Sequence, residues 1–264
     1  MQKASYIMTF RQGDGAQRRD NLVAVLAWLA QYPQFEPIVI EQDDAPRLQG
    51  ALPHPACTQV FAYNPGPFNK SWGLNIGFRL SVNPWLVFAD ADIVLGDALA
   101  EAATHLDKGY QAIKPYRRLI DLDDAESMRV RTGDFDFVPQ RDAAAPNREG
   151  VGEHIVFAGG VVLIARAAFV RMGGWDERFR GWGGEDDAMS YRLERARVAG
   201  IELDSRPAVH LVHPRAQETT FAQPHYADNR ALLEDYRRME DPQLQRFAEI
   251  QMQIIGNRDK YRPE

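Results

Sequence analysis

Short apolar runs alternate with helical patterns along the first third of the chain. Runs that end at turn residues are typical of buried strands, whereas apolar residues spaced three or four apart are typical of helices. Strands are expected over residues 5–10, 37–41, 58–63 and 84–89, and helices over 21–31 and 68–82. This order predicts a parallel sheet with right-handed crossovers.

The second half of the chain has a different pattern. Residues 120–153 are rich in Asp, Arg, Gly and Ala with weak periodicity, which favours a long functional or disordered loop. Later segments predict a strand pair or a strand and helix over 154–175, an acid-capped helix ending at Gly200, a strand over 207–214 and a helical tail from Asp228. We therefore expect one α/β domain, a mostly parallel sheet flanked by helices, with a C-terminal helical tail.

Composition narrows the class of protein. A chain of 264 residues can bury a large core without a disulfide or a structural metal. Its 31 Lys and Arg against 37 Asp and Glu give a net charge of −6, which argues against a nucleic-acid partner or an anionic-membrane surface. The single cysteine, Cys57, excludes an internal disulfide framework, and no apolar run is long enough to span a membrane. With no signal-peptide pattern at the start, these features predict a soluble cytoplasmic protein.

Two carboxylates end one of the expected strands. Asp90 and Asp92 flank Ala91 after the apolar run 85–89. Open α/β sheets bind ligands at the carboxyl ends of their strands, and carboxylate oxygens suit Mg²⁺ or Mn²⁺. Asp is also common in solvated turns, and the short D-x-D pattern alone favours that reading.

Two histidines lie close together in the last expected strand. His210 and His213 would point to opposite faces of an extended strand, so only one is expected to face a metal unless the strand bends. Imidazole is a good ligand for Mn²⁺ or Zn²⁺. Either histidine alone is better explained as a core or surface residue.

An acidic triplet follows a glycine-rich turn that carries a tryptophan. Acids at a helix N-terminus are favourable for the helix dipole, which is one sufficient reason for the triplet. The helix dipole does not explain why Trp182 stands between glycines. A large aromatic residue on a glycine-rich turn indicates a substrate lid or platform, and a carboxylate beside it could act as a general base. The segment reads Gly181-Trp182-Gly183-Gly184-Glu185-Asp186-Asp187.

Basic and glycine positions give weaker signals. Arg11 and Lys70 are candidate phosphate or nucleobase contacts, although surface solvation explains any single basic residue better. Gly159 and Gly160 would allow a sugar to approach the backbone, or would form a β-bulge. The basic residues of 114–118 could bind an anionic acceptor, but a solvated surface is the simpler interpretation.

Taken together and in order over residues 7–215, these motifs resemble the β-1,4-galactosyltransferase family of GT-A nucleotide-sugar glycosyltransferases. The chain is also similar to bacterial chondroitin-polymerase-like transferases. The segments that carry the resemblance are TFR at 9–11, IVIEQ at 38–42, FNK at 68–70, LNIGF at 74–78, FADAD at 88–92, FAGGV at 157–161 and GWGGEDD at 181–187. The chain departs from the animal members in having Thr9 for their Pro and in lacking their structural cysteines.

The resemblance implies roles for individual residues. Asp186 would be the catalytic base and Glu185 an acceptor contact, while Mn²⁺ or Mg²⁺ would be held by Asp92 and His213, with His210 and Asp90 as further candidates. The implied nucleotide contacts are Phe10, Arg11, Phe68, Lys70, Asp90 and Ala91, and the implied sugar contacts are Gly159, Gly160, Trp182, Gly183, Gly184 and Asp187.

The resemblance predicts an inverting, metal-dependent transferase that moves a hexose or N-acetylhexosamine from a UDP-sugar to a saccharide or glycolipid acceptor. Its expected domain is 1–215, with a nucleotide-binding part at 1–115 and an acceptor part at 154–215, followed by a helical extension at 216–264. Attachment to the inner face of a membrane would be peripheral. Two alternatives remain: a nucleotide-sugar-binding regulator, and a sugar nucleotidyltransferase that uses the loop GDGAQRR at 13–19.

Overall fold

A seven-stranded sheet forms the centre of the protein, which is described here from a computed structural model covering residues 2–140, 156–214 and 224–262. The strand order is β3-β2-β1-β4-β8-β6-β9. β1, β2, β3 and β4 run parallel, whereas β8 is antiparallel to both of its neighbours. The strands of this sheet are β1 (Ala4–Phe10), β2 (Phe35–Asp43), β3 (Thr58–Tyr63), β4 (Trp85–Ala89), β6 (Ala112–Lys114), β8 (Val161–Ala165) and β9 (Gly200–Glu202).

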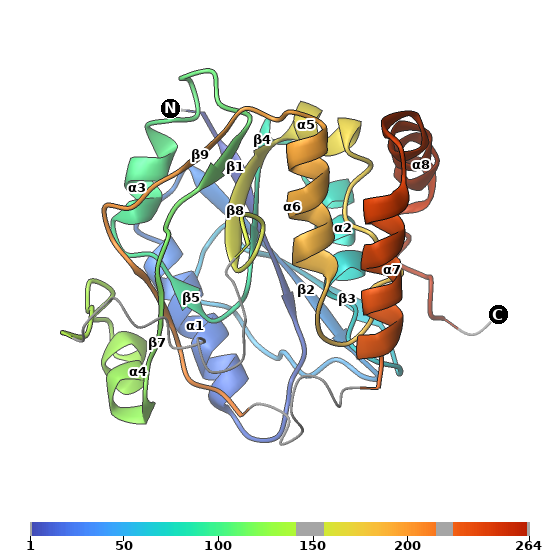
Figure 1. Ribbon diagram of the computed structural model, residues 1–264. Coiled ribbons are helices and arrows are strands. Elements are labelled where there is room, and N and C mark those ends of the chain that lie inside the picture. The colour runs from blue at the N-terminus through green and yellow to red at the C-terminus, as the bar shows by residue number, and fades with distance from the viewer. Residues whose placement is uncertain (1, 141–155, 215–223, 263–264) are drawn as a thin grey trace.

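Helices cover both faces of the sheet (Figure 1), so its central strands β1 and β4 are buried on both sides. Along β1, Tyr6 and Met8 pack into the core that contains α1 and α3, while Ile7 packs into the core that contains α2, α5 and α6. This alternation is the period of two that a strand imposes. The helices are α1 (Gln17–Leu29), α2 (Lys70–Leu80), α3 (Ala98–Ala103), α4 (Asp124–Arg131), α5 (Arg166–Arg171) and α6 (Glu185–Arg195).

A second, three-stranded sheet lies beside the first. Its order is β5-β10-β7, made from β5 (Ile93–Val94), β7 (Leu119–Asp121) and β10 (Ala208–His210). β10 pairs with β5 in the register His210 to Ile93 and with β7 in the register His210 to Asp121. The small sheet therefore brings residue 210 beside the chain that leaves β4 at Asp90.

Two C-terminal helices pack on the α6 side of the molecule (Figure 1): α7 (Tyr226–Arg238) and α8 (Asp241–Ile254). The tail beyond α8 returns to the start of α2. There the Trp72 indole donates to the backbone carbonyl of Asn257 at 2.8 Å, and the Asn69 amide donates to the Tyr261 hydroxyl at 3.0 Å. The tail therefore helps to fix the N-terminus of α2.

The expected fold class is confirmed, and three details of the sequence interpretation are wrong. Residues 120–140 contain α4, which begins with a capping box between Asp123 and Glu126, so this part is not a featureless loop. The last strand ends at His210 rather than at 214, and Gly200 begins β9 instead of ending α6. Residues 141–153 of the expected loop lie outside the described residues. None of the described helices combines the length and the hydrophobicity that a membrane span requires.

Candidate functional site

The candidate site forms where β4 ends and the small sheet begins. Asp90 and Asp92 follow β4 directly, and the backbone N–H of Asp90 donates to the carbonyl of Gly160 at 3.0 Å. The backbone N–H of Leu211 donates to the carbonyl of Asp92 at 2.8 Å. These backbone bonds bring together segments that lie about seventy to one hundred and twenty positions apart in sequence.

Both histidines face the carboxylate of Asp92. The Nε2 atom of His210 lies 3.5 Å from Oδ1, and that of His213 lies 3.2 Å from Oδ2. The expectation that the two rings point to opposite faces is wrong, because β10 ends at His210 and strand alternation does not continue to His213. The two rings meet edge to face, with centroids 5.3 Å apart.

The Nδ1 atoms of both rings, on the side away from Asp92, each lie within hydrogen-bond distance of an oxygen atom. Nδ1 of His210 lies 2.7 Å from Oδ1 of Asp121, and Nδ1 of His213 lies 3.0 Å from the carbonyl oxygen of Pro214. An Nδ1–H that donates to oxygen leaves the Nε2 lone pair free to bind a metal, and such partners orient metal-bound histidines. Asp121, a single acid at the end of a short strand, was not found from the sequence.

The donor set fits a divalent metal. Asp92, His210 and His213 each offer one ligand atom, and these atoms lie within 4.8 Å of one another. One carboxylate with two imidazoles suits Mn²⁺, which accepts both oxygen and nitrogen ligands. In the protein without metal, burial lowers the pKa of His210, but Asp92 and Asp121 raise it overall to about 9. Metal binding at this cluster therefore displaces protons.

Three further carboxylates surround Lys70. Its Nζ atom lies 2.9 Å from Oδ1 of Asp90, 3.2 Å from both carboxylate oxygens of Asp186 and 3.9 Å from Oε1 of Glu185. The Lys70 side chain is only 13% exposed, so water screens these contacts weakly. The predicted nucleotide contact Lys70 thus lies within a carboxylate cluster.

Burial and charge shift the acid–base properties of this cluster. Burial would lower the pKa of Lys70, but Asp186, Asp90 and Glu185 raise it well above its usual value. Burial and the neighbouring Asp186 raise the pKa of Glu185 to about 7. Burial also raises the pKa of Asp186, although Lys70 opposes the rise. The pKa values of Glu185 and Asp186 are therefore raised toward neutral pH relative to those of free side chains.

The glycine-rich turn places the acidic triplet at the start of α6. Gly181, Gly183 and Gly184 all have positive φ, and Gly184 precedes the first helical residue. Trp182 is 38% exposed, and its ring stacks on Tyr226 of α7 with centroids 5.9 Å apart. The amide of Asn229 donates to the Trp182 carbonyl at 3.1 Å. Helix α7 therefore holds this turn, a contribution that the sequence did not indicate.

Gly159 and Gly160 lie against the carboxylate cluster. A Cβ on Gly160, whose φ is +71°, would collide with the Tyr116 hydroxyl, and a Cβ on Gly159 would lie 3.5 Å from Oδ2 of Asp186. Lys114, expected at a solvated surface, is instead fully buried and donates to the Gly159 carbonyl. Its Nζ atom lies 4.3 Å from the centre of the Tyr116 ring, and burial lowers its pKa to about 7.

The predicted nucleotide contacts lie at the ends of β1 and β4. The guanidinium of Arg11 donates to the backbone carbonyls of Gln42, Gly66 and Asn64, and it lies over the Phe68 ring at 5.6 Å. Phe10 is buried, and Ala91 is half-buried. Arg11 therefore links the ends of β2 and β3 through hydrogen bonds, at the edge of the sheet where the other predicted nucleotide contacts lie.

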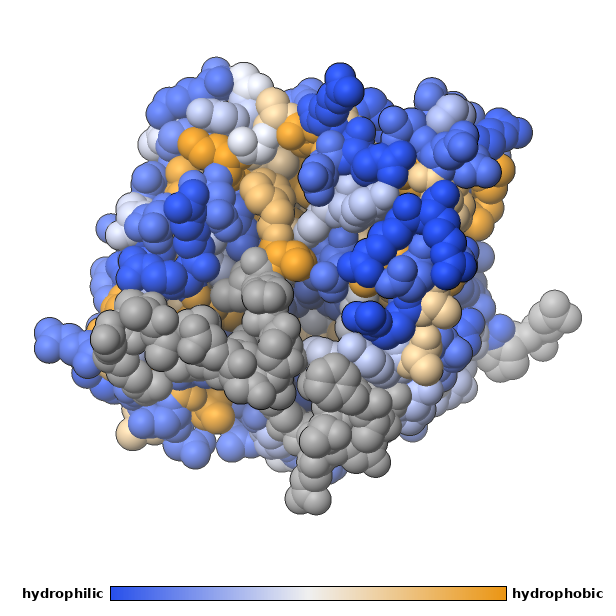
Figure 2. All heavy atoms as spheres, in the orientation of Figure 1, coloured by the Kyte–Doolittle hydropathy of each residue, from blue (hydrophilic) through white to orange (hydrophobic). Residues whose placement is uncertain are grey.

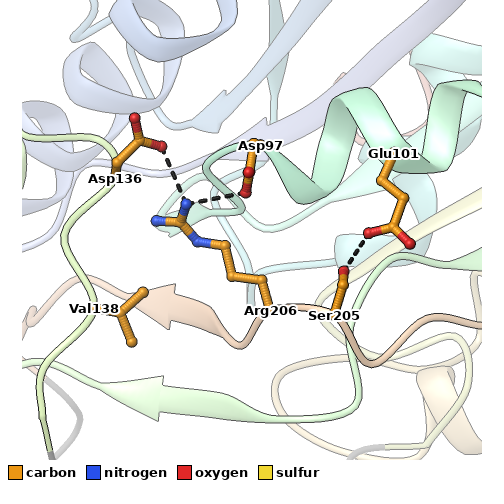
Figure 3. Close-up of a pocket in the computed structure, with 6 residues that line it drawn as sticks. All are labelled: Asp97, Glu101, Asp136, Val138, Ser205 and Arg206. Atoms are coloured by element: carbon orange, nitrogen blue, oxygen red, sulfur yellow. Dashed lines mark hydrogen bonds and ion pairs between the residues drawn. The ribbon is translucent and has the colours of Figure 1, made fainter.

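A separate hollow of about 360 Å³ lies at the far end of the small sheet (Figure 3). Arg206 extends across it and pairs with Asp97 at 3.0 Å and Asp136 at 3.1 Å. Ser205 donates to Glu101 beside it. Because the Arg206 guanidinium is already paired with two carboxylates, its charge does not indicate an anionic ligand for this hollow.

Part of this site lies in a region of the chain that is similar to a known sequence family. Residues 149–214 match the family described as N-terminal domain of galactosyltransferase. The matched region includes Gly159, the acidic triplet at 185–187 and both histidines. No curated protein matches the chain.

Solved structures with the same fold include two galactosyltransferase structures and one mannosyltransferase. The catalytic domain of Drosophila β-1,4-galactosyltransferase 7, in complex with xylobiose, has a TM-score of 0.53 and 16% identity over 86% of this chain and 80% of its own. A variant of that enzyme with manganese, UDP-Gal and xylobiose has the same score and identity over 91% and 82%. A mannosyltransferase from Pyrobaculum calidifontis with GDP-Man and Mn²⁺ has a TM-score of 0.54 and 14% identity over 96% and 73%.

The matches agree with the sequence resemblance. The region 149–214 and the fold both point to galactosyltransferase-like proteins of the GT-A type, as the motifs predicted. The Asp92, His210 and His213 cluster of this chain fits the expected divalent metal.

Proposed function

From the GT-A glycosyltransferase fold of this chain and its galactosyltransferase-family region, we propose an inverting, metal-dependent transferase. It would move a hexose or N-acetylhexosamine from a UDP-sugar to a hydroxyl group of a saccharide or glycolipid. Residues 1–115 would bind the nucleotide and 154–215 the acceptor, with 216–264 as a helical extension. The galactosyltransferase structure with UDP-Gal and manganese supports the choice of donor class.

One observation carries the proposal. Asp90 and Asp92 are separated by a single residue, yet Asp92 faces two imidazoles while Asp90 lies 2.9 Å from the ammonium that also contacts Asp186. The segment 90–92 thus contributes to the candidate metal cluster and, through Lys70, contacts the candidate general base on α6. A transferase that activates an acceptor and releases a diphosphate needs both groups close together.

Asp92, His210 and His213 would hold the metal ion, with Asp90 beside them. When bound, Mn²⁺ supplies Lewis-acid stabilisation of the negative charge on the departing diphosphate. Asp121 and the Pro214 carbonyl keep the two imidazoles turned toward Asp92. Phe10, Arg11, Phe68 and Ala91 would line the nucleotide at the adjoining strand ends.

Asp186 would take the proton of the acceptor hydroxyl as its oxygen attacks the anomeric carbon from the face opposite the diphosphate. Its raised pKa makes the carboxylate a stronger base than a solvated Asp, while Lys70 opposes the rise by favouring the ionised form. Glu185 and Asp187 would bind acceptor hydroxyls.

Closure around the sugars would involve the two glycine segments. Trp182 would cover the sugars and exclude water, which limits hydrolysis of the donor. Gly159, Gly160, Gly183 and Gly184 would allow the sugars to approach the backbone. At Gly159, the absence of a side chain beside Oδ2 of Asp186 is consistent with this role.

A donor panel tests the proposal. UDP-Gal, UDP-GalNAc, UDP-GlcNAc, UDP-Glc and GDP-Man are each incubated with Mn²⁺ or EDTA and a mixture of simple saccharides, and nucleotide release is measured. Release of UDP that requires Mn²⁺ and a saccharide supports the transferase. Release of pyrophosphate, or the absence of both UDP and Mn²⁺ binding in calorimetric titration, would contradict it.

A further inference from the structure

The two residues between the histidines have all of their backbone hydrogen-bonding groups occupied. The N–H of Leu211 donates to the carbonyl of Asp92 at 2.8 Å, and the N–H of Val212 donates to the Ser127 hydroxyl at 2.9 Å. The Asn21 amide donates to both carbonyls, at 3.3 Å for Leu211 and 3.2 Å for Val212. Three of these four groups bond to side chains, so the path of the backbone here depends on side chains from distant parts of the chain.

Arg131 completes this arrangement from the end of α4. Its guanidinium donates to Oδ1 of Asn21, from Nε at 2.9 Å and from Nη2 at 2.7 Å, and Nη2 also donates to the Val212 carbonyl at 2.8 Å. Hydrogen bonds from a charged donor are roughly twice as strong as neutral ones. Because a guanidinium can only donate, it requires Oδ1 of Asn21 on its own side and leaves Nδ2 facing the two carbonyls.

Asn21 and Ser127 make these contacts from the interior of the protein. Hydrophilic side chains predominate on the face shown in Figure 2, yet both of these polar residues are fully buried. Burial of a polar side chain is costly unless it has hydrogen-bond partners, which these two residues find at 211–212 and Arg131. Asn21 lies in α1 and Ser127 in α4, and the two helices contact each other. The helix pair therefore forms a buried support for this segment.

The support matters more for His213 than for His210. His210 lies in β10, and its Nδ1 atom lies 2.7 Å from Asp121 of the neighbouring strand β7. His213 follows the end of β10, and its Nδ1 atom bonds to the carbonyl of Pro214, the next residue in the chain. A partner in the same segment orients the ring relative to its own backbone but not relative to Asp92. The distance of 3.2 Å between Nε2 of His213 and Asp92 therefore depends on how the preceding backbone is held.

We propose that Asn21, Ser127 and Arg131 are positioning residues for the metal ligand His213. The inference rests on the proposed function, because it concerns the metal site that this function requires. A ligand that is already held in its binding orientation loses less conformational freedom when the metal binds. Loss of the support would leave all three ligands present but allow His213 to turn away from Asp92, so Mn²⁺ would bind more weakly.

Calorimetric titration of Mn²⁺ into the metal-free protein tests the proposal. Arg131→Met removes all three donated hydrogen bonds but keeps an unbranched side chain, and we expect its Kd for Mn²⁺ to rise about tenfold. Arg131→Lys, with one ammonium in place of the planar fork, should show a smaller rise. Arg129→Met is the matched control on α4, because it removes the ion pair with Asp134 and should bind Mn²⁺ like the wild type.

A purely structural role predicts a different pattern. Bonds that only stabilise the fold would lower the urea midpoint of the metal-free Arg131→Met protein and leave both the Kd for Mn²⁺ and the visible spectrum of bound Co²⁺ unchanged. We expect the Co²⁺ spectrum, which depends on ligand geometry, to change in Arg131→Met and not in Arg129→Met. Ser127→Ala removes the acceptor of the Val212 N–H and should also weaken Mn²⁺ binding, so it decides the case if Arg131→Met does not fold.

The outcomes separate this inference from the proposed function. Equal Mn²⁺ affinity in the wild type and in the folded Arg131 and Ser127 variants overturns the positioning role and leaves the transferase intact. Weaker Mn²⁺ binding in these variants, with no UDP release by the wild type in the donor panel, sustains the positioning role while the transferase fails. A wild-type protein that binds neither Mn²⁺ nor Co²⁺ overturns both.

Discussion

The ammonium nitrogen of Lys70 lies 3.2 Å from each carboxylate oxygen of Asp186. Lys70 begins α2, which packs on β1 and β2, whereas Asp186 lies in the first turn of α6. Since the same ammonium contacts Asp90 at 2.9 Å, one cation links the strand end that carries the candidate metal ligand to the helix that carries the proposed base.

Asp186→Asn tests the assignment of the base. An amide cannot accept the proton of the acceptor hydroxyl, so kcat should fall by about 10²–10⁴ while the calorimetric affinity for UDP stays within about twofold. Asp235→Asn, an exposed change on α7, is the matched control. Transfer close to the wild-type rate in Asp186→Asn would show that another group takes the proton.

Lys70→Met should shift the pH profile of kcat/KM. Without the ammonium, the pKa values of Asp186 and Glu185 rise further, because Lys70 lowers both. An ionised base then requires higher pH, so the acidic limb should move upward. Lys70→Arg, which retains the charge, should shift the limb less. An unchanged limb in the Met variant would disconnect Lys70 from the base.

Metal affinity should depend on Asp121 as well as on the ligands. His213→Ala removes a ligand and should abolish most Mn²⁺ binding in calorimetric titration. Asp121→Asn leaves the three ligands in place but weakens the orientation of His210, so Mn²⁺ affinity should fall by about 10–100-fold. His225→Ala, outside the cluster, should bind Mn²⁺ like the wild type. Equal affinities across the series would contradict this metal site.

Lys114→Met should change how stability depends on pH. The pKa of Lys114 falls from 10.5 to about 7 on burial, so the unfolded chain binds more protons between these values and wild-type stability rises with pH across that window. The variant lacks this contribution. Its free energy of unfolding relative to the wild type should therefore be higher at about pH 6 than at about pH 9. Urea unfolding at both pH values measures the difference, and equal differences would show that Lys114 is not titrating as a buried amine.

The sequence was sufficient for the fold class and for its longer strands and helices. Buried runs such as 85–89 and the helical spacing of 68–82 have strong periods, and the strands and helices formed where those periods indicated. The orientation of the histidines was not predictable, because it depends on β10 ending at His210 through pairing with β5 and β7. Strand length set by such distant pairing leaves no local pattern.

The sequence also did not predict which side chains contact one another in the site. Lys70 was a candidate phosphate or nucleobase contact, and the sequence did not predict its carboxylate neighbours because they depend on which segments the fold brings together. Asp121 and Lys114 lie in short strands of three residues, which are too brief for a clear period.

The contacts between the C-terminal tail and α2 affect the order in which the protein can assemble. The bonds from Trp72 to Asn257 and from Asn69 to Tyr261 span 185 and 192 positions. During synthesis, α2 would therefore emerge from the ribosome long before the residues that secure its first turn. The helix that presents Lys70 is among the first to be made, and it is among the last to be completed.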